Sequence, residues 1–365
     1  MKKVGLVGWR GMVGSVLMER MHAEHDFDFI DAHYFTTSQV GELAPNGKPL
    51  KDASSVKDLC EMDIILTCQG GDWTKEMHPK VRGAGWKGHW IDAASALRME
   101  KNAVIILDPV NQKVIDNARS DGLNDWIGGN CTVSLMLLGA GALFKNGWVE
   151  WASSHTYQAA SGAGAKNMIE LLSQMQFIGD KVREDIHASR SALEIEKKMN
   201  ELLGSSEFPK KEFGFPLAAN LLPWIDSALP SGQSREEWKA EAEANKILQT
   251  SKVIPIDGTC VRVSALRCHS QALTIKLKKD IPLAEIEAVI KNDNQWVRFV
   301  QNDKETTLKQ LTPASVSGKL DVAVGRVRKM SLGPEFVNLF TCGDQLLWGA
   351  AEPLRRMLRQ LVKNS

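Results

Sequence analysis

The sequence predicts an α/β chain of two domains, the first a doubly wound parallel sheet and the second an α+β domain. A chain of 365 residues holds more than one hydrophobic core. In its first third, short apolar segments alternate with segments whose apolar residues recur at helical spacing, which is the pattern of a doubly wound sheet. A glycine-rich turn follows the first strand and precedes a helix. These observations predict a ligand site at the edge where the strands end.

The glycine turn at Gly8, Gly11 and Gly14 follows the first expected strand, residues 4–7. Backbone N–H groups and the positive end of the next helix face the same space in such a turn. It therefore predicts a phosphate cradle in a Rossmann-like domain, although its spacing is GxxGxxG rather than the common GxGxxG. The alternative is an ordinary turn that packs a helix on the sheet.

Hydroxyl side chains follow the second expected strand, residues 32–36. Thr37 and Ser38 stand where an NAD site usually has a carboxylate for the ribose 2′-hydroxyl, and Arg10 lies in the first glycine turn. Hydroxyl donors and a guanidinium suit a 2′-phosphate, which a carboxylate would repel. The sequence thus favours NADP over NAD, unless residues 36–38 only cap the next segment.

The remaining strands of the first sheet are expected at residues 63–68, 90–92, 103–107 and 126–127. Gln69 and Arg98 follow two of these strands closely. The strand at 126–127 leads through two glycines to Cys131. All three side chains are therefore expected at the ligand-binding edge of the sheet.

Cys131 is the candidate nucleophile. Asn130 before it is a suitable N-cap, and residues 133–144 have a helical apolar pattern. The positive end of a helix favours the thiolate, which is the reactive form. The alternative is a small buried hydrophobe, as most free cysteines are.

His269 is the candidate proton carrier, because it stands with Arg262 in a mostly apolar segment, although a lone histidine there is more often a core residue.

The second domain is expected at residues 130–350, and the first at 1–129, completed by a C-terminal helix at 351–365. That helix belongs to an amphipathic segment of about twenty residues that ends near residue 362.

Glu236 and Lys239 share a face of a helix that begins after Ser234, and alone they suggest a solvated ion pair. The other expected elements are strands at 151–158 and two within 256–277, and helices at 167–177 and 192–203, with surface and a subunit contact expected over 178–230.

Composition excludes several classes of protein. The net charge of +1 points to neither nucleic acid nor a membrane surface, and no apolar run has membrane-spanning length. The N-terminal apolar run is too short for a signal peptide. The six cysteines form no CxxC pair and match no zinc spacing, so no metal is expected. We expect a cytoplasmic protein with free thiols.

A phosphate cradle, a cysteine at the sheet edge, a histidine and several arginines together indicate one chemistry. The cysteine attacks an aldehyde, the cofactor accepts hydride, and the thioester passes to water or phosphate. No carboxylate suited to activating water stands out, and the arginines indicate an anion.

The sequence resembles the aspartate-semialdehyde dehydrogenases of Gram-negative bacteria nearly from end to end. The motifs that carry the resemblance are GWRGMVGSVLM at 8–18, TTSQ at 36–39, TCQGGD at 67–72, WIDAASALRM at 90–99, ILDPVN at 106–111, GGNCTVSLML at 128–137, YQAASGAG at 157–164, REEWKAEAEANKIL at 235–248, CVRVSALRCHSQA at 260–272 and GDQLLWGAAEPLRRMLRQL at 343–361.

The resemblance implies the reversible, phosphate-dependent conversion of L-aspartate 4-semialdehyde to 4-phospho-L-aspartate with NADP. The step belongs to lysine, methionine, threonine and diaminopimelate biosynthesis. Cys131 would carry the thioester, His269 would act as acid and base, and Gln158 would orient the substrate. Family members are homodimers through the second domain, and a homodimer is therefore expected.

The resemblance also implies the binding residues. Arg262 would hold the α-carboxylate, and Glu236 the ammonium, which replaces the solvated-pair interpretation. The phosphate and substrate would further contact Arg98, Asn130 and Lys239. The cofactor site would comprise Gly8, Arg10, Gly11, Met12, Val13, Thr37, Ser38, Gln69, Ser161, Gly162 and Gln345. Members often carry a proline where residues 187–189 stand, so the adenine-side contact there is expected to differ.

Two other functions are weighed. A related reductase acting on N-acetylglutamyl phosphate is disfavoured by Glu236, because an acetylated amine has no charge for a carboxylate to meet. A non-catalytic NADP-binding sensor is disfavoured by the joint presence of Cys131, Gln158, Arg262 and His269.

Overall fold

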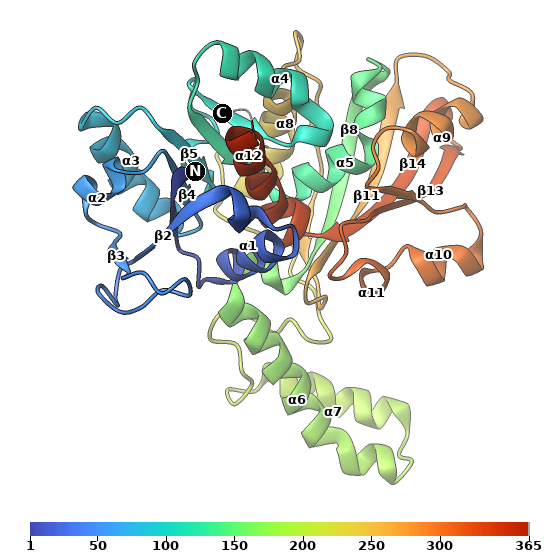
Figure 1. The fold of residues 1–365 in the computed structure, drawn as a ribbon. Coiled ribbons are helices and arrows are strands. Elements are labelled where there is room, and N and C mark those ends of the chain that lie inside the picture. The colour runs from blue at the N-terminus through green and yellow to red at the C-terminus, as the bar shows by residue number, and fades with distance from the viewer. Residues whose placement is uncertain (364–365) are drawn as a thin grey trace.

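The computed structural model describes residues 1–363, which form two seven-stranded sheets and a projecting helical arm (Figure 1). The first sheet is parallel throughout and has the order β3-β2-β1-β4-β5-β7-β6. Its strands are β1 (Lys2–Val7), β2 (Ile30–Thr36), β3 (Lys51–Asp52), β4 (Ile64–Thr67), β5 (His89–Asp92), β6 (Ala103–Ile106) and β7 (Asp125–Gly128). The predicted α/β class and parallel first sheet are confirmed.

Helices cover both faces of the first sheet, as its alternating pattern requires. Their bounds are α1 (Met12–Ala23), α2 (Val56–Cys60), α3 (Gly71–Gly83) and α4 (Asp108–Ser120), with short 3₁₀ helices at Asp26–Phe29 and Ser95–Leu97. Val4 and Leu6 of β1 pack with α1 and α4, whereas Val7 packs with α2 and α3 on the other face. Both faces are therefore buried, as expected for a parallel sheet.

The carboxyl ends of the central strands form one row. Thr67 is in register with Val7 and with Asp92, and Asp92 with Ile127. The glycine turn after β1 and the segment after β7 consequently lie at the same edge of the sheet, where ligands of such sheets bind.

The second sheet is mixed and has the order β10-β8-β11-β14-β13-β12, with β9 added beside β8. Its strands are β8 (Val149–Gln158), β9 (Ile256–Asp257), β10 (Cys260–Arg262), β11 (Cys268–Leu277), β12 (Val297–Phe299), β13 (Val322–Met330) and β14 (Gly333–Asp344). Residues 256–277 form three strands where the sequence predicted two, because β9 and β10 pair with different parts of β8.

Helix α5 (Cys131–Lys145) is the core helix of this second half. Its residues from Thr132 to Phe144 are all buried, and they pack with the second sheet in one large apolar cluster. The other helices are α6 (Ala165–His187), α7 (Ala192–Gly204), α8 (Arg235–Leu248), α9 (Leu283–Lys291), α10 (Lys304–Gln310) and α11 (Pro313–Val316), with a 3₁₀ helix at Ala160–Ala163.

Helices α6 and α7 form an arm that projects from the body (Figure 1). Helix α6 is longer than the predicted 167–177, and α7 agrees with the predicted charged helix. Ile169, Leu172 and Ile186 of α6 are exposed, as is Leu193 of α7. Most of the predicted surface stretch, residues 178–230, is exposed or half-buried, although Phe208, Leu217 and Ala218 are buried. The subunit contact stays a prediction.

The C-terminal segment returns to the first sheet. The predicted helix of about twenty residues is divided into a π-helical turn at Leu347–Ala351 and helix α12 (Glu352–Lys363). Residues 364 and 365 of the predicted helix lie outside the described residues. Leu354 and Leu358 pack in the same cluster as β1 and α1, and Figure 1 shows α12 in red near α1.

Buried charges fix α12 to the N-terminal part of the chain. Arg355 donates to Asp26 at 2.9 Å and to Glu352 at 2.9 Å, and Arg20 of α1 donates to Glu352 at 3.0 Å. The Glu352 side chain is fully buried, so its charge depends on these two partners for stabilisation.

Replacing Glu352→Gln is expected to lower the free energy of unfolding by about 3 kcal/mol, because Arg355 and Arg20 lose a buried counter-charge. Denaturant unfolding followed by tryptophan fluorescence measures the change. Glu19→Gln, on an exposed position of the same helix as Arg20, is the matched control and should change little. Equal stability of the two variants would contradict the assigned role of the cluster.

Candidate active site

Asn130 begins helix α5 and so positions Cys131. Its side-chain oxygen accepts the backbone N–H groups of Thr132 at 3.0 Å and Val133 at 3.2 Å. The predicted N-cap is therefore present, and Cys131 is the first residue of the helix. The β7 strand ends three residues earlier, which places the sulfur at the ligand-binding edge of the first sheet.

His269 of β11 lies against the sulfur of Cys131, with 3.2 Å between Nε2 and Sγ. Its other ring nitrogen, Nδ1, accepts the backbone N–H of Ala159 at 3.0 Å. A neutral imidazole has one donor and one acceptor nitrogen. The neutral ring therefore carries its proton on Nε2, facing the sulfur.

The Cys131 thiol and the His269 imidazole are both uncharged near neutral pH in this structure. Burial raises the pKa of the Cys131 thiol to about 12, the Glu236 carboxylate acts in the same direction, and Arg262, Arg98 and Lys239 oppose them. Burial, aided by Arg262, lowers the pKa of His269 to about 3. This direction is opposite to the easily deprotonated thiol that the sequence predicted, because burial disfavours the thiolate more than the neighbouring cations favour it.

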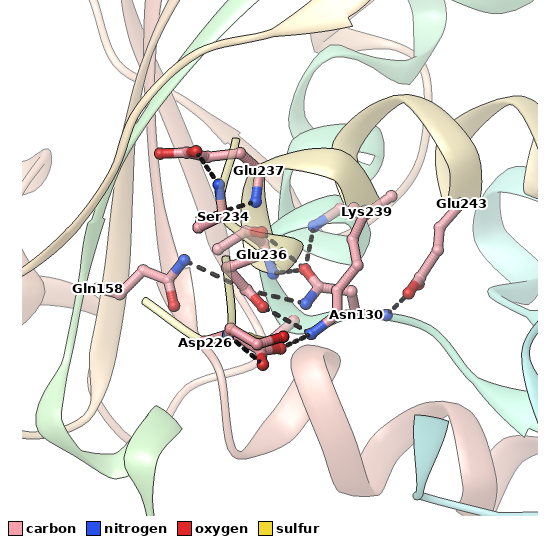
Figure 2. A network of polar contacts seen from close by, with 12 residues as sticks. Asn130, Gln158, Asp226, Ser234, Glu236, Glu237, Lys239 and Glu243 are labelled. Carbon is pink, nitrogen blue, oxygen red and sulfur yellow. Dashed lines mark hydrogen bonds and ion pairs between the residues drawn. The ribbon is translucent and has the colours of Figure 1, made fainter. Parts of the chain in front are cut away.

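A buried network centres on Glu236 of α8 (Figure 2). Its carboxylate accepts from Asn130 Nδ2 at 2.9 Å, Gln158 Nε2 at 3.2 Å and Lys239 Nζ at 2.9 Å. Burial acts to raise the pKa of Glu236, but Lys239 and the two amides hold it below the ordinary value. Glu236 is consequently a buried anion on the wall of the site.

The two arginines of the site differ in how many donors they have left. Arg262 of β10 is buried and donates to the carbonyl of Ala159 at 2.8 Å, and none of the described carboxylates pairs with it. Arg98 donates to the carbonyls of Gly128, Gly129 and Ala93 at 2.7, 3.1 and 3.5 Å, and to Glu243 at 3.1 Å, which leaves one of its five N–H groups. Arg262 therefore has most of its fork available to an anion, whereas Arg98 has little.

A cavity of about 570 Å³ brings most of the predicted residues together. Cys131 lines it, and Gly349 packs so closely behind that an added Cβ would lie 2.6 Å from the Cβ of Cys131. The predicted residues on its wall are Met12, Val13, Arg98, Asn130, Cys131, Gln158, Ser161, Gly162, Glu236, Lys239, Arg262 and Gln345. His269 reaches the site through its contact with the sulfur.

A second cavity of about 340 Å³ lies at the glycine turn. Gly8 has a φ of +71°, and an added Cβ would lie 2.5 Å from the backbone of Cys68, so only glycine fits there. Arg10 Nη2 donates to Thr36 Oγ1 at 2.7 Å. The predicted residues on this wall are Gly8, Arg10, Gly11, Thr37 and Gln69, while Ser38 is exposed beside them.

Three residues of the site were not predicted. Glu243 accepts the backbone N–H of Asn130 at 2.7 Å, and it follows Lys239 by one helical turn, which was a usable signal. Asp226 accepts from Lys239 at 2.8 Å, and Gly349 packs on Cys131. Both come from segments whose position depends on the tertiary fold, so no local pattern marks them.

Within residues 1–363, no group of three or more His, Cys, Asp or Glu side chains is arranged to hold a metal ion. In the same part of the chain, no helix combines the length and apolar character needed to cross a membrane. All six cysteines are free.

Two family models match the chain. The semialdehyde dehydrogenase NAD-binding domain matches residues 3–118, and the semialdehyde dehydrogenase dimerisation domain matches residues 141–348. The first of these indicates a pyridine nucleotide cofactor, and the second a domain that mediates dimers in this family.

Solved structures agree with the family models. An aspartate-semialdehyde dehydrogenase from Francisella tularensis is 52% identical over 99% of this chain and 100% of its own, with a TM-score of 0.96. Aspartate-semialdehyde dehydrogenase II from Vibrio cholerae, solved with ASA, shares the fold at 22% identity over 100% and 99% of the two chains, with a TM-score of 0.80. The enzyme from Candida albicans, solved with NADP, shares it at 16% identity, with coverage of 100% and 99% and a TM-score of 0.66.

Replacing Glu236→Gln is expected to lower the pKa of Cys131, because it removes a carboxylate that raises that pKa. Since the thiol is mostly protonated below pH 9, each unit of decrease raises the thiolate fraction about tenfold. Iodoacetamide alkylation at pH 8, located on Cys131 by peptide mass spectrometry, should therefore be faster in the variant. Glu42→Gln, at an exposed position far along the chain, is the charge-matched control. Unchanged or slower alkylation would contradict the electrostatic assignment.

Proposed function

Because the chain belongs to the aspartate-semialdehyde dehydrogenase family, we propose that it interconverts L-aspartate 4-semialdehyde and 4-phospho-L-aspartate with NADP and phosphate, through a thioester on Cys131. The observation that carries the proposal is the contact of 3.2 Å between Cys131 and His269, at a cavity that is also lined by Arg98, Lys239 and Arg262. A nucleophile with a proton carrier and three cations suits acyl transfer to an anion.

Arg262 and Glu236 bind the amino-acid end of the substrate. The free donors of Arg262 form a fork for the α-carboxylate, and its burial keeps that interaction strong. The Glu236 carboxylate faces the same cavity and accepts the ammonium group. An N-acetylated substrate has no ammonium group to pair with this buried carboxylate, so it would lack that attraction and would bring a bulkier neutral amide against the charge.

Cys131 and His269 perform the covalent steps. As the Sγ–C bond forms, His269 donates its Nε2 proton to the aldehyde oxygen and takes the thiol proton in return, so the ring ends neutral. NADP, when bound, supplies the acceptor for the hydride. As the hydride leaves, the hydroxyl proton passes to water in the cavity by exchange at His269 Nε2, which leaves the thioester and a neutral ring. Attack of phosphate on the acyl carbon then forms the acyl phosphate and breaks the C–Sγ bond, and the phosphate proton passes through Nε2 to the sulfur, so that Cys131 returns to the thiol. Gln158, held by Glu236, orients the substrate beside the sulfur.

Lys239, Asn130 and Arg98 form the phosphate side of the cavity. Lys239 supplies the main positive charge for phosphate, because Arg98 is largely engaged with backbone carbonyls and Glu243. Arg98 therefore contributes its remaining N–H and its positive charge. This difference between the two cations supports a phosphate position near Lys239.

The glycine-turn cavity fits the 2′-phosphate end of NADP. Arg10 is held at the end of β2 by Thr36, and Thr37 lies beside it. Gly11 supplies backbone at the start of α1, and Gln69 closes the opposite wall. Met12, Val13, Ser161, Gly162 and Gln345 lie on the wall of the larger cavity, where the nicotinamide end would reach. The Candida albicans relative was solved with NADP, which agrees with this choice.

The proposal extends to assembly and cellular role. The proposed boundary between the two domains lies between residues 129 and 130, and α12 completes the first domain. The partly exposed aromatic pairs Tyr157–Phe340 and Trp151–Phe336 on the second sheet support a homodimer through this domain. Six free thiols support a cytoplasmic location. The reaction would supply lysine, methionine, threonine and diaminopimelate synthesis.

The purified enzyme should reduce NADP with aspartate semialdehyde only when phosphate is supplied, and NAD should be a poor substitute. Absorbance of the reduced cofactor at saturating semialdehyde, with and without phosphate and with each cofactor, gives the result. Activity that persists without phosphate would overturn the acyl-phosphate reaction, and equal use of NAD would overturn the role of Arg10.

The Cys131→Ala variant should lose turnover by about 10³-fold or more, because no other group can form the thioester. NADP binding, measured by isothermal calorimetry, should be retained since the glycine turn is untouched. Cys60→Ala, a partly buried thiol of α2 outside both cavities, is the control and should remain active. Near-normal turnover of the Cys131 variant would reject the nucleophile.

A further inference from the structure

Lys239 is held between two carboxylates. Its Nζ lies 2.8 Å from Asp226 Oδ2 and 2.9 Å from Glu236 Oε2, and its side chain is only 12% exposed (Figure 2). Asp226 also lines the cavity that contains Cys131. We propose that Asp226 is a specificity-determining residue that occupies the phosphate position on Lys239 until phosphate displaces it. This inference rests on the proposed function.

The charges require one carboxylate to leave. One ammonium between two carboxylates has a local net charge of −1, and like charges repel strongly in a partly buried site. Phosphate at neutral pH carries between one and two negative charges. It therefore cannot bind to Lys239 on favourable terms while both carboxylates stay in contact with it.

Asp226 is the carboxylate that is free to move. Glu236 is buried and is also bonded by the side-chain amides of Asn130 and Gln158. The Asp226 side chain is 35% exposed, and apart from Lys239 it accepts only the backbone N–H of Ser227 at 2.7 Å among the described contacts. Rotation of Asp226 into solvent therefore breaks fewer bonds than any movement of Glu236.

The backbone at Asp226 shows that the contact is built into the fold. Its φ is +72°, in the left-handed region that L-residues rarely adopt. Trp224 Nε1 donates to the Asp226 carbonyl at 3.0 Å and holds this conformation. Asp tolerates this region better than most residues, and in this conformation its carboxylate reaches Lys239.

The arrangement selects among anions. A ligand must bind Lys239 and the remaining donor of Arg98 better than Asp226 does in order to replace it. Chloride and nitrate carry one charge and offer weak acceptors, whereas phosphate and arsenate offer several strong oxygens. Asp226 thus raises the phosphate concentration that the enzyme needs and protects the site from weak anions.

The test is a phosphate titration of wild type, Asp226→Asn and Asp226→Ala at saturating NADP and semialdehyde. The KM for phosphate should fall by about 3- to 10-fold in both variants, after correction for any change in the KM for semialdehyde. This is the size of effect expected when one partly exposed ion pair is lost. Both should also become more sensitive to inhibition by nitrate. Asp257→Asn, an exposed carboxylate that bonds Gln233 outside the cavity, controls for net charge and should behave as wild type.

A KM for phosphate that rises or stays constant in both variants would overturn the inference, because Asp226 would then only hold Lys239 in place. Circular dichroism confirms that each variant folds, and the Asn variant keeps the shape of the side chain. Wild-type activity that does not depend on phosphate would reject the proposed function itself, and this inference with it. The wild-type arm of the titration separates the two failures.

Discussion

The structure depends on how the chain is held between the end of β7 and the start of α5. Arg98 binds the carbonyls of Gly128 and Gly129, and Glu243 binds both Arg98 and the N–H of Asn130. Backbone groups that would otherwise lack partners at a buried strand end are thereby satisfied. The position of the Cys131 sulfur follows from this junction, because the junction fixes where α5 begins.

Burial, more than any single ion pair, sets the protonation states of the ionisable groups in the site. Burial keeps Cys131 and His269 neutral, although three cations line the same cavity. Glu236 stays anionic only because Lys239 and two amides support it. The cavity wall therefore carries cations beside a neutral thiol and a neutral imidazole.

Much of the architecture could be predicted because its signals are local. Apolar runs marked the strands of the first sheet, and Asn130 marked the helix start. The roles of Glu236 and Lys239 came from family resemblance, since alone they look like a surface pair. The raised pKa of Cys131, the contact of Asp226 with Lys239 and the π-helical turn at Gly349 could not be predicted, because each depends on residues far apart in sequence.

The position of α12 has a consequence for how the chain folds while the ribosome makes it. Arg355 pairs with Asp26 across 329 residues of chain, and Leu354 and Leu358 cover the first sheet. While the ribosome is still making the protein, one apolar face of that sheet lacks its last cover, and the wall behind Cys131 is absent. Contacts of such long range form late and slowly. The nascent chain therefore exposes an incompletely covered sheet, and lacks the residue that packs against Cys131, until residues 349–358 have been made and have folded back.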